Sequence, residues 1–194
     1  ELRGEVRRQL LRSGEVAGEV AAAGLPAAGL QAAELQLQAE GVEDLPVAAV
    51  VEALRLQERL AAPLRAVLAP MPLYVFNSDE ERGALQRLLA AQAHAANQAG
   101  QPAEAASLFE RANASWPSRP LAISALNMHL KAGDPSLALA GYWVLMRGPL
   151  TAAQRALVQR KLLEAWLGYQ RQAAAARLLQ ARLSLGLARR RRGC

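Results

Sequence analysis

The chain has 194 residues, of which 52% are apolar and only 4% are aromatic, and its formal net charge is +6. This length fits one domain or one elongated array, with enough apolar residues for a continuous core. The single cysteine, Cys194, excludes an internal disulfide framework and a cysteine-based zinc site, and no apolar stretch approaches the roughly 20 residues that span a bilayer.

Alanine, leucine and glutamine make up much of the chain, whereas β-branched residues are sparse, and this composition predicts an all-α fold. The charge is unevenly placed along the chain. Residues 1–100 hold 9 basic and 13 acidic side chains, whereas residues 145–194 hold 11 basic side chains against Glu164 alone. The positive net charge is therefore a property of the C-terminal segment.

Residues 1–77 are predicted to form an N-terminal helical region. Residues 24–29 match residues 100–105 in the placement of glycine, proline and alanine, and residues 61–66 match them more weakly. Alanine-rich sequence also produces such matches by chance. The region is therefore either two degenerate helical hairpins or helices without a repeat.

Two helix-terminating signals divide this N-terminal region. Gly41 and residues 44–46 indicate the end of one helix and the start of the next. Residues 70–76 combine two prolines with two aromatic residues and predict a non-helical loop that packs on the array or meets a partner.

A glycine register dominates the C-terminal half. Gly100, Gly133 and Gly168 lie 33 and 35 residues apart, and an alanine follows each of them five positions later. A fixed period in the mid-thirties, with glycine between two helical segments, is typical of helical-hairpin repeat arrays. The register therefore predicts an α-solenoid of antiparallel helical hairpins.

Local capping signals place the helices of this array. Ser78 begins a helix whose first turn is acidic, and Asp134-Pro135 begins another. Residues 147–149 are predicted to end the preceding helix, and Thr151 is predicted to cap the next one. Three hairpins are predicted, over 78–114, 118–146 and 151–185, with intervening turns at Gly100, Gly133 and Gly168. These repeats make up residues 78–186, and residues 187–194 form a basic C-terminal tail.

Residues 99–109 resemble the glycine, small-residue and aromatic pattern of the tetratricopeptide repeat family, and Ala112 and Pro117 also match that pattern. Residues 131–133 and 145–149 are similar instead to the pentatricopeptide family, in which a methionine precedes a glycine and a proline. The resemblance covers about residues 80–185 and implies a right-handed superhelix of eight to ten helices. The choice between the two families stays open.

The two families imply different ligands. Tetratricopeptide arrays bind protein segments in a concave groove, whereas pentatricopeptide arrays bind single-stranded RNA through a few side chains on the first helix of each repeat. Here the first helices offer residues 123–125 and 157–159, which are mostly apolar. The third unit also departs from the pattern, since Arg177 stands where the aromatic residue is expected. Sequence-specific base recognition is therefore not expected.

The C-terminal arginines are the candidate binding site, because the planar guanidinium group matches phosphate in a bidentate manner. An arginine-rich helix and tail predict a salt-dependent contact with RNA or another polyanion, and the alternative is a solvated helix face with a soluble tail. An anionic membrane surface fits less well, since the last helix lacks large aromatic anchors. The predicted polyanion-binding residues are Arg171, Arg177, Arg182, Arg189, Arg190, Arg191 and Arg192.

The aromatic residues and histidines have simpler explanations. Trp116, Trp143, Trp166, Tyr142 and Tyr169 could stack on bases, but packing between helices is the favoured interpretation. His94 and His129 have no ligand partner near them in sequence, so no metal site is expected. No catalytic residue, cofactor or small-molecule substrate is predicted.

The sequence thus predicts a non-enzymatic scaffold, specifically a structural subunit of a larger RNA-containing assembly such as a mitochondrial ribosome. Residues 1–12 mix arginine with glutamate, unlike an acid-poor transit peptide. We therefore expect an organellar matrix protein whose presequence has been removed. The alternative is a tetratricopeptide-type adaptor of the bacterial cytoplasm that acts in assembly or secretion.

Overall fold

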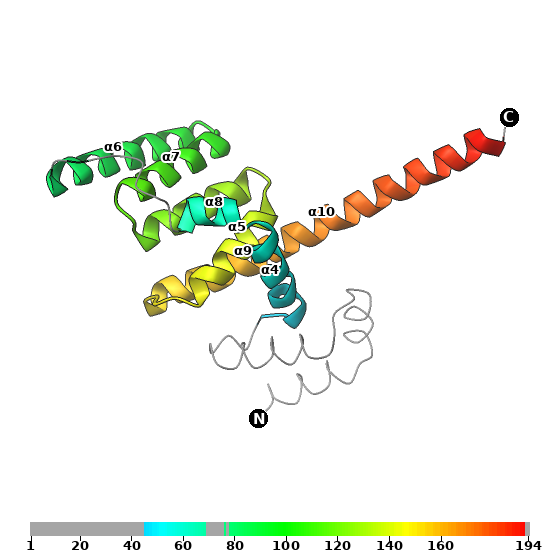
Figure 1. Ribbon diagram of the computed structural model, residues 1–194, viewed down its shortest axis with the longest axis horizontal. Helices are drawn as coiled ribbons and strands as arrows, with labels where there is room; N and C mark the ends of the chain where they lie inside the picture. Colours follow the sequence, from blue (N-terminus) through cyan, green and yellow to red (C-terminus); the bar gives the residue numbers. More distant parts are fainter. Residues whose placement is uncertain (1–44, 69–75, 77, 193–194) are drawn as a thin grey trace, which may run out of the picture.

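A computed structural model describes residues 45–68, 76 and 78–192 of the chain, with side chains described as far as Ser184 (Figure 1). These residues form seven helices and no strand, which confirms the predicted all-α fold. The predicted hairpins within residues 1–44 and most of the predicted loop over 70–76 lie outside the described residues. The helices are α4 (Val47–Arg59), α5 (Ala61–Leu68), α6 (Asp79–Gln98), α7 (Pro102–Ser115), α8 (Arg119–Lys131), α9 (Pro135–Met146) and α10 (Ala152–Arg192).

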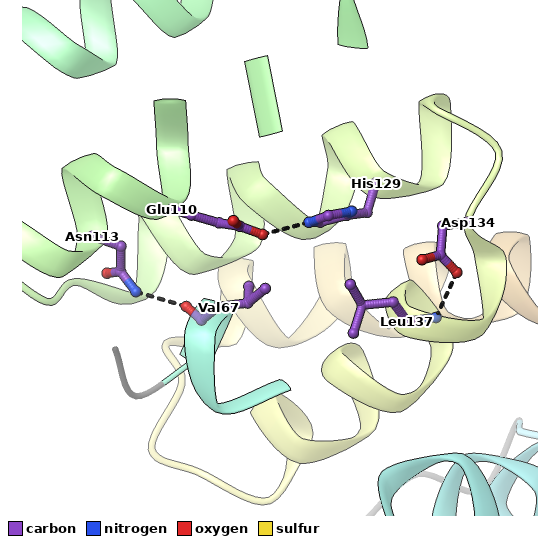
Figure 2. Close-up of polar contacts among 6 residues, drawn as sticks. All are labelled: Val67, Glu110, Asn113, His129, Asp134 and Leu137. Atoms are coloured by element: carbon purple, nitrogen blue, oxygen red, sulfur yellow. Dashed lines mark hydrogen bonds and ion pairs between the residues drawn. The ribbon is translucent and has the colours of Figure 1, made fainter. Parts of the chain in front are cut away.

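Side-chain caps begin the helices where the sequence predicts them. Ser78 Oγ accepts a hydrogen bond from the backbone N–H of Glu81 at 3.2 Å, which begins α6. Asp134 Oδ1 accepts from the backbone N–H of Leu137 at 3.1 Å and begins α9 (Figure 2). Thr151 caps α10, because its hydroxyl accepts from Gln154 N–H at 3.2 Å. Each cap satisfies a backbone donor that the first turn of a helix leaves unpaired.

Two of the three register glycines end helices as predicted. Gly100 and Gly133 have φ angles of +75° and +89°, in the left-handed region that glycine adopts without strain. In each case the next residue donates its N–H back to the last turn, from Gln101 to Ala96 O and from Asp134 to His129 O, both at 2.9 Å. This is the Schellman arrangement of a helix C-terminus.

The predicted third hairpin over 151–185 is wrong, because Gly168 lies inside one continuous helix, α10. Gly100 and Gly133 are each followed by a residue and then a proline, which cannot continue the preceding helix. No proline follows Gly168, and the residues after it are mostly alanine, leucine, glutamine and arginine, which favour helix. The three glycines are similarly spaced, but they have two different structural roles: two end helices and one lies inside a helix.

Gly168 instead allows two helices to approach closely. A Cβ atom at this position would lie 3.2 Å from Cβ of Pro135, the first residue of α9. The predicted separate tail over residues 187–194 is also corrected, since residues 187–192 continue α10 to Arg192.

Helix α9 is the centre of the fold, packed against α4, α5, α8 and α10 (Figure 1). The helix is apolar around its whole circumference, which is the pattern of a helix buried on all sides. Its largest side chains, Tyr142 and Trp143, are fully buried. The packing of α4 and α5 on α9 joins segments far apart in the chain, which neither the glycine register nor the capping signals indicate.

Close packing of α8 on α9 depends on Gly141. A Cβ atom there would lie 2.8 Å from Leu126 Cδ1 of α8 and closer still to Cδ2, and Leu126 is fully buried. We expect Gly141→Val to lower the free energy of unfolding by about 1–3 kcal/mol, because overpacking forces side chains off their rotamers. Chemical denaturation followed by circular dichroism measures this loss.

A double-mutant cycle identifies the cause of this loss. Leu126→Ala removes the atoms that collide, so the double variant Gly141→Val/Leu126→Ala should lose less stability than the two single variants combined. Strictly additive losses would contradict a steric origin at this contact.

Candidate functional site

The candidate site lies on α10, which has a packed half and a projecting half (Figure 1). Val158, Leu162 and Ala165 are buried on the packed half, which contacts α9 and α8. Gln172 is near the edge of the body, where its Nε2 donates to Gly133 O at 2.8 Å. From Ala174 to Ser184 every side chain is exposed, so this part of the helix extends beyond the described body.

A polar contact holds the packed half of α10 to the N-terminal helices. Tyr169 Oη donates to Glu52 Oε1 of α4 at 2.6 Å, and the Tyr169 ring stacks on Trp166 with ring centroids 6.1 Å apart. Burial, followed by the hydrogen bond to Glu52 and the charge of that carboxylate, raises the pKa of Tyr169 to about 12. The hydroxyl therefore stays protonated and acts as the donor at neutral pH.

The structure places all three described arginines of the candidate site in exposed positions on α10: Arg171 lies at the edge of the body, and Arg177 and Arg182 lie on the projecting half. Arg171 and Arg182 share one face, since 11 residues at 100° each bring them within about 20° of one another, separated by about 16 Å along the axis. Arg177 points about 120° away from Arg171 by the same geometry. The three arginines therefore present positive charge around the helix and do not form one narrow stripe.

The charge of this segment has no acidic counterpart within it. Residues 165–194 contain seven arginines and no acidic residue, and the backbone of Arg189–Arg192 forms the last turn of α10. The only contact described for Arg171 is a bond from its Nε to Leu167 O of the same helix, at 3.2 Å. A concentration of positive charge on one helix creates a local positive potential, which salt screens.

The aromatic residues mostly belong to the core, as predicted. Tyr142 and Trp143 are fully buried, and Tyr142 Oη donates to Asn127 Oδ1 at 2.7 Å. Trp116 differs, because its side chain is 40% exposed. The Arg82 guanidinium lies 5.8 Å from the centroid of the Trp116 ring and 5.6 Å from that of Phe76, a cation–π arrangement that the sequence did not reveal.

Of the six positions that would recognise bases in a pentatricopeptide array, 123–125 and 157–159, three are buried and three are half-buried. Ile123, Ala125 and Val158 lie in the core, where they contact other helices. These three side chains are therefore occupied by packing within the fold.

The histidines pair with neighbouring residues of the fold. His129 Nε2 lies 2.6 Å from Glu110 Oε1 and joins α8 to α7 (Figure 2). The His94 ring meets the Phe109 ring edge to face, with centroids 5.1 Å apart. The part of the chain that the structure describes contains no group of three or more histidine, cysteine, aspartate or glutamate side chains with metal-binding geometry.

A second candidate surface is an open depression between α6 and α7, with a volume of about 550 Å³. Its lining combines alanine side chains with polar groups, among them Gln92, Gln101, Glu104 and Arg111. Small side chains leave room for an extended segment to approach the helices. None of the helices within the described ranges is long and apolar enough to cross a membrane.

Comparison with known proteins adds no assignment. No protein-family model, curated protein or solved structure matches this chain.

Proposed function

We propose that this chain is a non-enzymatic helical scaffold in a larger RNA-containing assembly, and that α10 contacts RNA phosphate. The observation that carries this proposal is the C-terminal half of α10, which exposes Arg171 at the edge of the body and Arg177 and Arg182 beyond it, with no acidic residue beside them in sequence. Phosphate contacts of this kind tolerate any base sequence, as expected of a structural subunit.

The helical hairpins α6–α7 and α8–α9 support the scaffold part of the proposal. Each hairpin is closed by a short glycine turn, and α7 packs on α8 as well as on α6. We propose that these hairpins are degenerate repeats of the tetratricopeptide and pentatricopeptide kind. An organellar ribosome in the mitochondrial matrix is the proposed setting.

The triple variant Arg171→Gln/Arg177→Gln/Arg182→Gln tests the RNA contact. We expect its affinity for single-stranded RNA, measured by fluorescence anisotropy over a salt series, to fall about tenfold or more at low salt. The slope of log affinity against log salt should also shrink by about 2, since each phosphate contact on a single strand contributes about 0.7.

A matched control carries the same change in net charge on the body of the protein. Arg59, Arg65 and Arg87 are exposed arginines on α4, α5 and α6. Replacing these three arginines by glutamine should leave the RNA affinity, and the slope of log affinity against log salt, mostly unchanged. Equal losses in both triple variants would show nonspecific attraction to net charge, and an unchanged affinity in the α10 variant would refute the RNA contact.

The depression between α6 and α7 favours a second candidate function, a tetratricopeptide-type adaptor that binds a protein segment. In that case Ala95→Trp, which fills the lining of the depression, would abolish capture of the partner protein. The same substitution would leave RNA affinity unchanged, which separates the two functions.

A further inference from the structure

The face by which α10 packs on the body continues, with the same spacing, onto the projecting half. Apolar or packing residues recur along α10 at alternating intervals of four and three. Because this spacing averages 3.5 residues per turn, the residues line one side of the helix, as in a coiled coil. We call them the α10 seam: Val158, Leu162, Ala165, Tyr169, Gln172, Ala176, Leu179 and Leu183.

Burial along the seam changes sharply at the edge of the body. Val158, Leu162 and Ala165 are fully buried, whereas Leu179 and Leu183 are 61% and 69% exposed. Within the described residues, the helices that cover the seam cover only its first half (Figure 1). The second half keeps the pattern of a packed helix while its apolar side chains face open space.

The composition of the projecting half favours helix, but its exposed side chains give it no stabilising packing within the described body. Isolated helices are marginal in water, and most helical stability in proteins comes from packing of an apolar face. Exposed leucines at seam positions supply such a face, and burying them against a partner is favourable because it removes apolar surface from water. The seam therefore fits a second helix laid alongside Ala176, Leu179 and Leu183.

Charge decides which helix fits. Arg182 immediately precedes Leu183 in the seam and borders its apolar side, and the whole segment from residue 165 to the C-terminus contains no acidic residue. In a pair of such segments, the Arg182 side chain beside each seam would find no carboxylate on the other copy to pair with. Like charges opposed across an interface repel one another, so pairing of two copies is disfavoured.

We propose that the exposed half of the α10 seam binds an amphipathic helix of another protein, apolar at heptad spacing and acidic at the flanking positions. The bound helix would extend the packing that α9 provides on the first half of the seam. Arg171 and Arg177 lie away from the seam and stay accessible. The docking site shares Arg182 with the proposed phosphate contact, but its own determinants are the seam leucines, which are tested by different substitutions.

The chain offers a closely matched pair of variants for the test. Leu178 and Leu179 are neighbours with similar exposure, 65% and 61%, but only Leu179 belongs to the seam. We compare the full chain with Leu179→Gln/Leu183→Gln and with Leu178→Gln. The probe is a designed helical peptide with leucine at both apolar heptad positions and glutamate at both flanking positions, and its counterpart carries lysine in place of glutamate.

Fluorescence anisotropy with labelled peptides measures the binding. We expect the full chain to bind the acidic peptide about tenfold or more tightly than the basic one, since opposite charges flank the seam. Leu179→Gln/Leu183→Gln should weaken this binding about tenfold or more. Leu178→Gln should weaken it by about twofold or less, as expected of a side chain outside the contact.

Three outcomes would overturn the proposal. Equal binding of the acidic and basic peptides would show that charge does not select the partner helix. Equal losses of affinity for Leu178→Gln and for Leu179→Gln/Leu183→Gln would show that the seam is not the binding face. If the full chain self-associates in sedimentation velocity and Leu179→Gln/Leu183→Gln abolishes this, the seam binds a second copy of this chain and not another protein. Circular dichroism of each variant confirms that the body remains folded.

Discussion

Trp143→Ala will lower the free energy of unfolding by about 3–5 kcal/mol, the largest single loss expected in this chain. Trp143 is the largest of the fully buried side chains, and it lies on α9, which α4, α5, α8 and α10 surround. Truncation removes the apolar surface of the indole and leaves a cavity that four packed helices cannot collapse to fill. Domains of this size are stable by only about 5–15 kcal/mol, so the variant loses much of its stability.

Two further tryptophan variants separate cavity formation from loss of the indole itself. Trp143→Phe should cost less than Trp143→Ala, because phenylalanine fills most of the volume. It also removes the indole N–H, which finds no acceptor among the described residues. Trp116→Ala is the control, since Trp116 is 40% exposed and should cost about 1 kcal/mol or less.

Urea denaturation followed by far-ultraviolet circular dichroism measures the three free energies. The expected order of loss is Trp143→Ala, then Trp143→Phe, then Trp116→Ala. Equal losses for Trp143→Ala and Trp116→Ala would contradict the central position of α9 in the core.

Asn113→Ala is expected to cost about 2–4 kcal/mol, because it leaves two backbone groups without their partner. The Asn113 side chain is 1% exposed, and its Nδ2 donates to Val67 O of α5 at 2.8 Å (Figure 2). Its Oδ1 accepts from the backbone N–H of Ser118, the cap of α8, at 2.7 Å. One amide therefore joins the end of α5 to the connection between α7 and α8.

Asn97→Ala is a matched control for this prediction. Asn97 also joins two helices through its amide, where Oδ1 accepts from Lys131 Nζ at 3.0 Å, but this bond is exposed to water. Its loss should change the stability by about 0.5 kcal/mol or less, since water replaces the partner. Chemical denaturation of both variants under the same conditions compares them, and similar losses would show that burial of Asn113 contributes nothing.

The helix boundaries could be predicted from the sequence because their causes are local. Ser78, Asp134 and Thr151 cap helices through bonds to residues three positions later, and Gly100 and Gly133 end helices through their own backbone conformation. Each signal acts over a few residues and needs no knowledge of the rest of the fold.

Gly168 shows where this local reasoning fails. Its spacing from Gly133 and the alanine five residues later match the other units, yet α10 passes through it without a break. Glycine is permitted both at a helix end and where two helices approach closely, so its presence alone does not distinguish them. The missing proline after Gly168 was the available signal.

The candidate site was also predicted only in part from the sequence. Its arginine composition and lack of acidic residues are evident in the sequence alone. Its geometry is not, because the sequence predicted a folded-back hairpin and a separate tail where α10 continues as one projecting helix. The exposure of Leu179 and Leu183 follows from that projection, since the same residues in a hairpin would face the core.

The sequence by itself determined that the described part of the chain is helical, where most of its helices begin and end, and where positive charge accumulates. Only the tertiary structure decided that α4 and α5 cover α9, that Asn113 links α5 to the α7–α8 connection, and that α10 extends beyond the body. The reason is physical: capping bonds and helix propensity act between near neighbours. The partners of an apolar face depend instead on which surfaces the whole chain brings together.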